Sequence, residues 1–550
     1  MKRLRTLGPW IAILLVSTLV RLPTLTAGLP YLNYVDEGHV LHHVIHHLDR
    51  GTWVPDTYSY PTLPFYIVTA AALAYSPVYK AVHGRSLRDD LSPMPPVYYD
   101  VVLPTELLIL GRLITLAFSL GLVLLTGLYV RRLAGPAAGL FAAWTAALLP
   151  APVARSVIVN INPIVAFFAL AAFYFAEDAR EGDRPWRGAA LAGVMVGLAT
   201  VSKYPSALVC LPVTLAILLA RRPFKDRVRQ LFLAGGAALL AAIVCMPALV
   251  LRTRDVRDQM GNMSSVYEHQ GIGSYWDQAV LRGEWDLPLE HPELGIVFLV
   301  LTAAGVAVGL ADRRWRKTAL GWVLFAAATA VLLAPYNFRA FRNLLPLLPL
   351  ACAAVALLYA RVREALPQPH AADVAAVLVP VTLFFPALDQ YLRHQSTLVD
   401  TREQALQWLA ENTRPWDRIL VSEELTFLPT RLATLKAETA VRPWRRARQR
   451  IMQRRFSYVV VGELKTRDNR PMISTPDRER ILAIYEPQIE LGSSPTFASR
   501  GGFRGNGQKI FILKRKRPLR EGRGKVAGVI EKEASKPPGD KSPGYKGSAP

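Results

Sequence analysis

Long apolar runs recur along the chain, and they limit its fold more than any other feature. A helix of about 20 apolar residues crosses the roughly 30 Å of hydrocarbon in a bilayer. Such runs lie near residues 8–27, 106–130, 136–152, 161–176, 188–202, 205–220, 231–251, 293–311, 318–335, 343–360 and 371–388. The sequence therefore predicts a mainly α, polytopic membrane protein with about 11 transmembrane helices. We expect the first of them to be an uncleaved helix.

Basic residues are concentrated in the short loops between these runs. The 550-residue chain has a formal net charge of +23, which in a soluble protein would suggest nucleic acid as a partner. Here the loops read RRLAG, EDAREGDRPWR, RRPFKDRVR, DRRWRK and RVREALPQPH. Lys and Arg in short loops mark the cytoplasmic side of a membrane protein. The charge therefore indicates topology, so we expect membrane lipids as partners and no nucleic acid.

The opposite side of the membrane receives two long loops, 28–105 and 252–292. Within the first loop, the apolar stretch 61–82 is expected to lie along the membrane surface. A crossing there would invert every later loop against its charge. We predict that residues 1–388 form one transmembrane domain that includes both loops.

The sequence changes character after residue 388. DTREQALQWLAENT has the spacing of a helix, whereas RILVSEE, SYVVVGE and QKIFILKR are typical of short buried strands. We therefore predict a small extracytoplasmic α/β domain over residues 389–513. The remaining residues, 514–550, are rich in Lys, Gly, Pro and Ser and are expected to form a disordered basic tail.

Three stretches carry a resemblance to a known family. They read VDEGHVLHHVIHHLDRGTWVPDTYSYPTLPFYIV, ATVSKYPSALVCLP and YNFRAFRNLLPLLPL. In this order, with an acidic pair after the first helix, they resemble the GT-C glycosyltransferases that use lipid-phosphate sugars. That group holds the protein O-mannosyltransferases and the aminoarabinose transferases of lipid A. Two stretches depart from it: SYPTLP lacks the basic residue that relatives often carry before the prolines, and NINPIV lacks the acid that many relatives place there.

The resemblance implies roles for the acidic pair and for three cations. Asp36 would be the catalytic base, and Glu37 its neighbour, which orients the acceptor or holds the loop. Lys203, Arg339 and Arg342 would bind the phosphate of the donor. Each role has a structural alternative: Asp36 and Glu37 also suit the start of a helix, and Lys or Arg near a helix end can reach the membrane interface.

Five histidines follow the acidic pair at helical spacing. His39, His42, His43, His46 and His47 would share one side of an amphipathic helix at the membrane surface. His39 and His43 could bind substrate or, with the acidic pair, hold a divalent ion. Aromatic residues that could line the substrate site are Tyr60, Trp276 and Tyr336, although aromatic belts place tyrosines at the same depth. No metal or other cofactor is required by the predicted chemistry.

By the resemblance, the chain is a membrane glycosyltransferase. It would move a hexosyl or pentosyl group from a polyprenyl-phosphate carrier to a hydroxyl of a glycan, lipid or protein. The expected place is the outer face of a bacterial plasma (inner) membrane. Two alternatives stay open: a metal-dependent ligase or oligosaccharyl transferase for pyrophosphate-linked glycans, and a lipid or glycan transporter. The predicted spans are nearly free of charge, which is unusual for a transporter.

Overall fold

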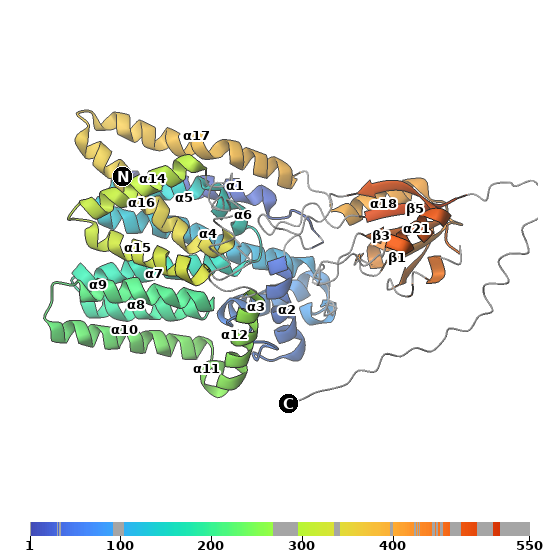
Figure 1. Cartoon of the computed structure of the whole chain (residues 1–550), viewed down its shortest axis with the longest axis horizontal. Helices are drawn as coiled ribbons and strands as arrows, with labels where there is room; N and C mark the ends of the chain where they lie inside the picture. Colours follow the sequence, from blue (N-terminus) through green and yellow to red (C-terminus); the bar gives the residue numbers. More distant parts are fainter. Residues whose placement is uncertain are drawn as a thin grey trace, which may run out of the picture.

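Helices dominate the computed structural model of the chain (Figure 1). It describes residues 2–516 except 30, 32–34, 92–103, 268–294, 335–340, 397–399, 463–474, 492–509 and short stretches at 423–424, 426, 428, 443–445, 447–448 and 452–454. Most of the predicted loop 252–292 and residues 517–550 of the predicted tail 514–550 thus lie outside the described residues, whereas Lys514 and Arg515 belong to a strand.

Every apolar run of the sequence coincides with a helix of the main bundle. These helices are α1 (Lys2–Arg21), α4 (Thr105–Ala134), α5 (Pro136–Leu148), α7 (Ile161–Glu181), α8 (Pro185–Thr200), α9 (Cys210–Leu218), α10 (Phe224–Cys245), α14 (Ile296–Ala311), α15 (Arg316–Leu333), α16 (Leu348–Ala365) and α17 (Pro369–Ser396). By length and composition, 8 of the described helical segments can cross a membrane, or 9 if α5 and the bent α6 (Pro150–Ser156) form one span. The number of 11 crossings stays a prediction, because α8, α9 and α14 are short.

Small residues allow the bundle helices to approach one another closely. A side chain added at Gly193 of α8 would place its Cβ 2.1 Å from the backbone oxygen of Ala234 on α10. At Gly305 of α14, a Cβ would lie 2.0 Å from the backbone oxygen of Ala354 on α16. Close backbone approach through glycine is typical of helix packing in membranes, where lipid removes the usual hydrophobic drive for association.

A second group of helices lies at the end of the bundle nearest the C-terminal sheet (Figure 1). It contains η1 (Leu22–Thr24), α2 (Val35–Arg50), α3 (Leu63–His83), η2 (Leu87–Asp90), η3 (Tyr204–Val209), α11 (Ala248–Leu251), α12 (Thr253–Tyr267) and η5 (Phe341–Leu347). We call this the α2 end of the bundle. Helix α3 is long and apolar enough to span a bilayer, so its predicted place along the membrane surface stays a prediction.

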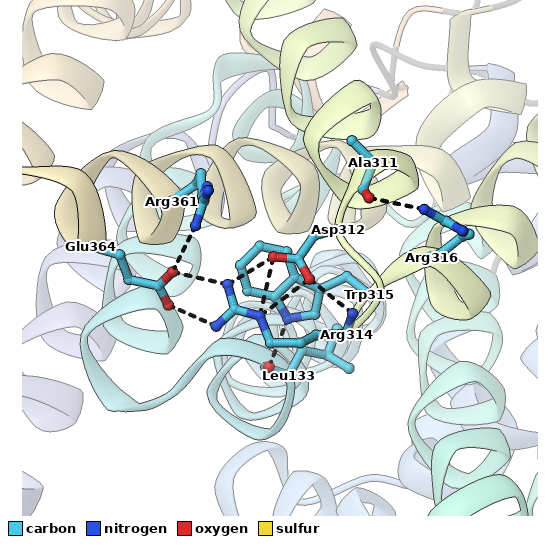
Figure 2. A network of polar contacts seen from close by, with 8 residues as sticks. All are labelled: Leu133, Ala311, Asp312, Arg314, Trp315, Arg316, Arg361 and Glu364. Atoms are coloured by element: carbon cyan, nitrogen blue, oxygen red, sulfur yellow. Dashed lines mark hydrogen bonds and ion pairs between the residues drawn. The ribbon is translucent and has the colours of Figure 1, made fainter.

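A polar network stabilises the opposite end of the bundle (Figure 2). Arg314, in the turn between α14 and α15, lies 2.8 Å from Asp312 and 2.9 Å from Glu364 of α16. Its guanidinium stacks 4.4 Å from the ring centroid of Trp315. Trp315 is buried and donates a hydrogen bond to the carbonyl of Leu133 on α4. The network thereby connects the turn to two other helices.

The C-terminal residues form a mixed five-stranded sheet with the order β2-β1-β3-β5-β4. Its elements are α18 (Thr401–Asn412), β1 (Arg418–Ser422), α19 (Pro429–Leu432), β2 (Glu438–Arg442), β3 (Tyr458–Gly462), α21 (Thr475–Ile484), β4 (Tyr485–Leu491) and β5 (Ile510–Arg515). The three predicted strands are β1, β3 and β5, and the predicted helix is α18. The parallel strand β2 and the antiparallel strand β4 were not predicted, because β2 is only half-buried and β4 is mostly exposed.

Candidate active site

A buried ion pair fixes the start of helix α2. Arg112 of α4 donates to both carboxylate oxygens of Glu37, at 2.7 and 3.0 Å. The backbone N–H of Val159 donates a third hydrogen bond to Glu37, at 3.0 Å. Arg112 also donates to the carbonyls of Leu25 and Ala27, which precede α2. The pair thus connects α2 with α4, with the turn before α7 and with the end of η1.

These contacts bear on the role predicted for Glu37. The side chain of Glu37 is fully buried and that of Arg112 is 1% exposed. Bidentate Arg–carboxylate pairs are strong and directional. The contacts favour the loop-holding role over direct contact with the acceptor. Asp36 belongs to the first turn of α2, but the position of its side chain lies outside the described residues. The same holds for Trp276, Tyr336 and Arg339.

Lys203 lies where two further segments meet. It follows α8, and its Nζ donates to the side-chain oxygens of Asn162, at 2.8 Å, and Asn343, at 2.6 Å. Asn162 is in the first turn of α7, whose cap is Asn160. Asn343 is in η5, next to the half-buried Arg342. The structure therefore brings Lys203 beside the segment of Arg342, as a shared phosphate site requires.

Two neutral side chains help to orient Lys203. Both amide oxygens accept from its ammonium group without adding negative charge. The N-terminus of α7 adds the positive end of a helix dipole. Asn162 stands in the NINPIV stretch, where the sequence departs from many relatives by having no acid. In this stretch it is an amide that contacts the lysine.

The loop between α2 and α3, residues 51–62, contacts the Lys203 turn on both sides. Tyr204 donates its hydroxyl to the carbonyl of Tyr58, at 2.9 Å. The backbone N–H of Leu63 donates to the carbonyl of Val201, at 3.1 Å. Thr57 and Tyr58 donate to the side chain of Gln259 on α12. The loop therefore joins the lysine turn to α12.

Histidines connect the same loop to α2. His42 Nε2 lies 2.8 Å from one carboxylate oxygen of Asp56, and His43 Nδ1 lies 2.7 Å from the other. The His39 ring lies 4.6 Å from that of Tyr60, centroid to centroid, and His47 Nδ1 is 3.0 Å from the hydroxyl oxygen of Thr69 on α3. The sequence analysis did not identify Asp56. The feature that could have pointed to it is a carboxylate in the Gly- and Pro-containing turn GTWVPDT.

Two of the five histidines on α2, His43 and His47, are buried, and the other three are partly exposed. His43 and His47 are 0% and 2% exposed, because α3 and the following loop pack over them. Burial lowers the pKa of His43. Burial and the neighbouring imidazoles lower the pKa of His39 to about 3 and that of His47 to about 4.

Asp56 is charged in this setting. Burial opposes its ionisation, but hydrogen bonds with His42 and His43 outweigh burial and hold the pKa of the Asp56 carboxyl well below its usual range. In the part of the chain that the structure describes, no three His, Cys, Asp or Glu side chains are grouped so as to hold a metal ion. His43 instead pairs with Asp56.

Two comparisons with known proteins bear on the architecture of the bundle. A family model described as dolichyl-phosphate-mannose-protein mannosyltransferase matches residues 107–251, which run from α4 to α11. The structure of ArnT from Cupriavidus metallidurans bound to undecaprenyl phosphate has a TM-score of 0.53 and 12% identity, covering 92% of this chain and 98% of that one. This chain has the GT-C fold. The architecture that the sequence resemblance implied is thereby confirmed.

Other comparisons are weaker. The apo form of the same ArnT gives a TM-score of 0.51 at 12% identity, covering 92% of this chain and 97% of that one. The oligosaccharyltransferase AglB from Archaeoglobus fulgidus, in complex with an inhibitory peptide and a dolichol-phosphate, gives 0.48 at 14% identity, covering 84% and 70%. No curated protein matches the chain by sequence.

Proposed function

We propose that this chain is an integral-membrane glycosyltransferase that moves a sugar from a polyprenyl-phosphate carrier to an acceptor hydroxyl. The observation that carries the proposal is Lys203, held between Asn162 and Asn343 at the α2 end of a GT-C bundle. The family matched by residues 107–251 is named for a lipid-phosphate sugar. The ArnT structure with undecaprenyl phosphate supports the same class of donor.

In the proposed reaction, Asp36 acts as the base and three cationic side chains stabilise the leaving phosphate. Asp36 accepts the proton of the acceptor hydroxyl while the hydroxyl oxygen bonds to the anomeric carbon of the sugar. The bond from that carbon to the phosphate oxygen breaks, and polyprenyl phosphate leaves with the electron pair. Lys203, Arg339 and Arg342 stabilise the negative charge of the leaving phosphate. Glu37 and Arg112 keep the start of α2 in place during transfer.

The α2 end faces away from the cytoplasm in this proposal. Basic residues at the opposite end support the orientation: Arg131 and Arg132 end α4, and Arg314 and Arg316 lie in the turn before and at the start of α15. Positive charge in such loops stays in the cytoplasm. We infer a bacterial plasma membrane as the location, with the sugar a hexosyl or pentosyl group and the acceptor a glycan, lipid or protein.

Substitution of Asp36 tests the chemistry. Asp36→Asn keeps the size of the side chain and removes the basic carboxylate, so transfer should fall by roughly 10² to 10⁴-fold. Binding of polyprenyl phosphate and insertion into the membrane should be unchanged. His46→Gln on the same helix is the matched control and should transfer sugar nearly as fast as the wild type. If Asp36 only caps α2, Asn serves equally well, and full activity of Asp36→Asn would refute the base assignment.

The donor can be identified in cells. Mass spectrometry of lipid-linked sugars after loss of the protein should show one polyprenyl-phosphate monosaccharide accumulating. Accumulation of a pyrophosphate-linked glycan instead, together with loss of transfer on adding a chelator, would replace the proposal with the ligase alternative. Unchanged amounts of all lipid-linked sugars after loss of the protein would contradict glycosyl transfer from such a carrier.

A further inference from the structure

The loop between α2 and α3 contacts both halves of the proposed reaction centre. On one side, Asp56 meets His42 and His43 of α2, the helix that carries Asp36. On the other side, Tyr58 of the loop contacts Tyr204, which follows Lys203, and Leu63 at the start of α3 contacts Val201, two residues before Lys203. The short backbone segment from Asp56 to Tyr58 thus links the helix of the acid to the turn of the lysine.

The geometry points to Asp56 as a positioning residue that holds this loop closed on α2 and so keeps the Lys203 turn in place for the donor phosphate. This inference rests on the proposed function and adds a residue to it. Asp56 does not contact the substrate. It holds the loop, and the contacts of Tyr58 and Leu63 beside Lys203 hold the lysine turn.

The burial of the two partners explains why Asp56 matters. The side chain of His43 is 1% exposed, and that of Asp56 is 32% exposed. Nδ1 of the buried His43 lies 2.7 Å from an oxygen of Asp56, so loss of the carboxylate would remove the charge that this imidazole faces, which disfavours the closed loop. His42 is 26% exposed and can turn to water, so it adds less to closure.

The loop is also held at its far end. Gln259 of α12 accepts hydrogen bonds from Thr57 and Tyr58, and Thr62 donates to the carbonyl of Cys245 at 2.9 Å. Because these contacts persist when Asp56 is changed, the loop should loosen from α2 and not unfold altogether. A change at Asp56 is therefore expected to act on donor binding more than on the stability of the bundle.

A double-mutant cycle separates positioning from general destabilisation. The variants are Asp56→Asn, Lys203→Met and the double variant, each purified as the full chain, and the measurement is the Kd for sugar-free polyprenyl phosphate. We expect Asp56→Asn to weaken binding about tenfold, Lys203→Met to weaken it more, and the double variant to bind no more weakly than Lys203→Met alone. Asp56→Glu should recover part of the affinity, because it restores the carboxylate.

Asp49→Asn is the matched control. Asp49 lies near the end of α2, its side chain is 60% exposed, and its carboxylate lies 3.8 Å from Arg50. Its substitution should leave both the Kd and the thermal midpoint unchanged. If Asp56→Asn proves too unstable to purify, His42→Gln removes one of the two contacts and should raise the Kd in the same direction by a smaller factor.

The outcomes distinguish this inference from the proposed function. If Lys203→Met binds polyprenyl phosphate as tightly as the wild type, the phosphate role of Lys203 fails, and the inference fails with it. If Lys203→Met weakens binding but the effects of Asp56→Asn and Lys203→Met multiply, the proposed function stands and Asp56 is not a positioning residue. An unchanged Kd in both Asp56→Asn and His42→Gln would overturn the inference in the same way.

Discussion

The buried pair of Glu37 and Arg112 allows one prediction to be worked through from the structure. Glu37→Gln keeps the shape of the side chain but removes its charge and leaves the guanidinium of Arg112 without its carboxylate. Removing one partner of a buried ion pair costs about 3 to 5 kcal/mol. Arg112 retains its hydrogen bonds to the carbonyls of Leu25 and Ala27, so we expect the lower value, about 3 kcal/mol.

That cost should appear as a local loss of order at the start of α2. At about 1.4 kcal/mol for each factor of ten, 3 kcal/mol shifts the local equilibrium roughly 100-fold toward an open arrangement. Transfer should fall by up to that factor if only the closed arrangement is active. The assay measures the rate of sugar transfer and the apparent thermal midpoint of the purified variant, with the amount of protein matched to the wild type.

A second substitution distinguishes the holding role from a catalytic one. Glu37→Gln combined with Arg112→Gln removes both charges, so it should cost less stability than the two single changes added together. If Glu37 only holds α2, the double variant should also recover part of the transfer rate. A Glu37→Gln variant with the wild-type thermal midpoint and a wild-type rate would refute this reasoning. A lost rate at an unchanged midpoint would instead favour direct participation of Glu37 in the reaction.

The structure supports three further predictions. In the folded chain the pKa values of His39 and His47 are lowered to about 3 and about 4. In the unfolded chain both imidazoles have their ordinary pKa of about 6.5, so below that pH the unfolded state binds more protons than the folded state. Thermal stability should therefore be full above pH 6.5 and decline toward pH 4, by up to about 1.4 kcal/mol per pH unit for each group, and His47→Gln should flatten the decline. Cysteine in place of Asp90 or Thr430 should react with a membrane-impermeant thiol reagent added outside, whereas cysteine in place of Lys225 should not; the reverse pattern would invert the proposed orientation. Trp315→Ala should cost about 3 to 5 kcal/mol of stability, against at most about 1 kcal/mol for Arg314→Ala, whose ion pairs are exposed; equal thermal midpoints for the two variants would show that the buried ring is not what stabilises this end.

Hydrophobic pattern predicted the helices well because lipid and core demand the same long apolar runs. All the predicted runs are helical in the structure, and strands β1 and β3 were recognised because both are apolar and almost wholly buried. Strand β4 has three exposed residues in a row, Glu486, Pro487 and Gln488, and β2 is short and half-exposed. Neither pattern differs enough from that of a loop, since the sheet, not the strand's own sequence, keeps these segments extended.

The candidate site was predicted less completely than the fold, for a different reason. Arg112 lies within the predicted span 106–130, and a lone arginine in an apolar run requires a partner from elsewhere in the chain. Glu37 is that partner, but the pairing depends on how α2 packs against α4, which a single sequence does not give. Asp56 was missed because a carboxylate in a polar turn is common, and only its contacts with His42 and His43 distinguish it.

The surroundings of Lys203 connect the absence of an acid from the NINPIV stretch with the proposed phosphate site. A carboxylate at position 162 would lie within hydrogen-bonding distance of the ammonium group and would repel a phosphate approaching the same lysine. Asn162 and Asn343 keep the geometry of such a contact, at 2.8 and 2.6 Å, without adding negative charge. These two amide oxygens therefore orient the lysine without adding a negative charge that would repel the donor phosphate. The absence of an acid from the NINPIV stretch thus remains consistent with the phosphate-binding role proposed for Lys203.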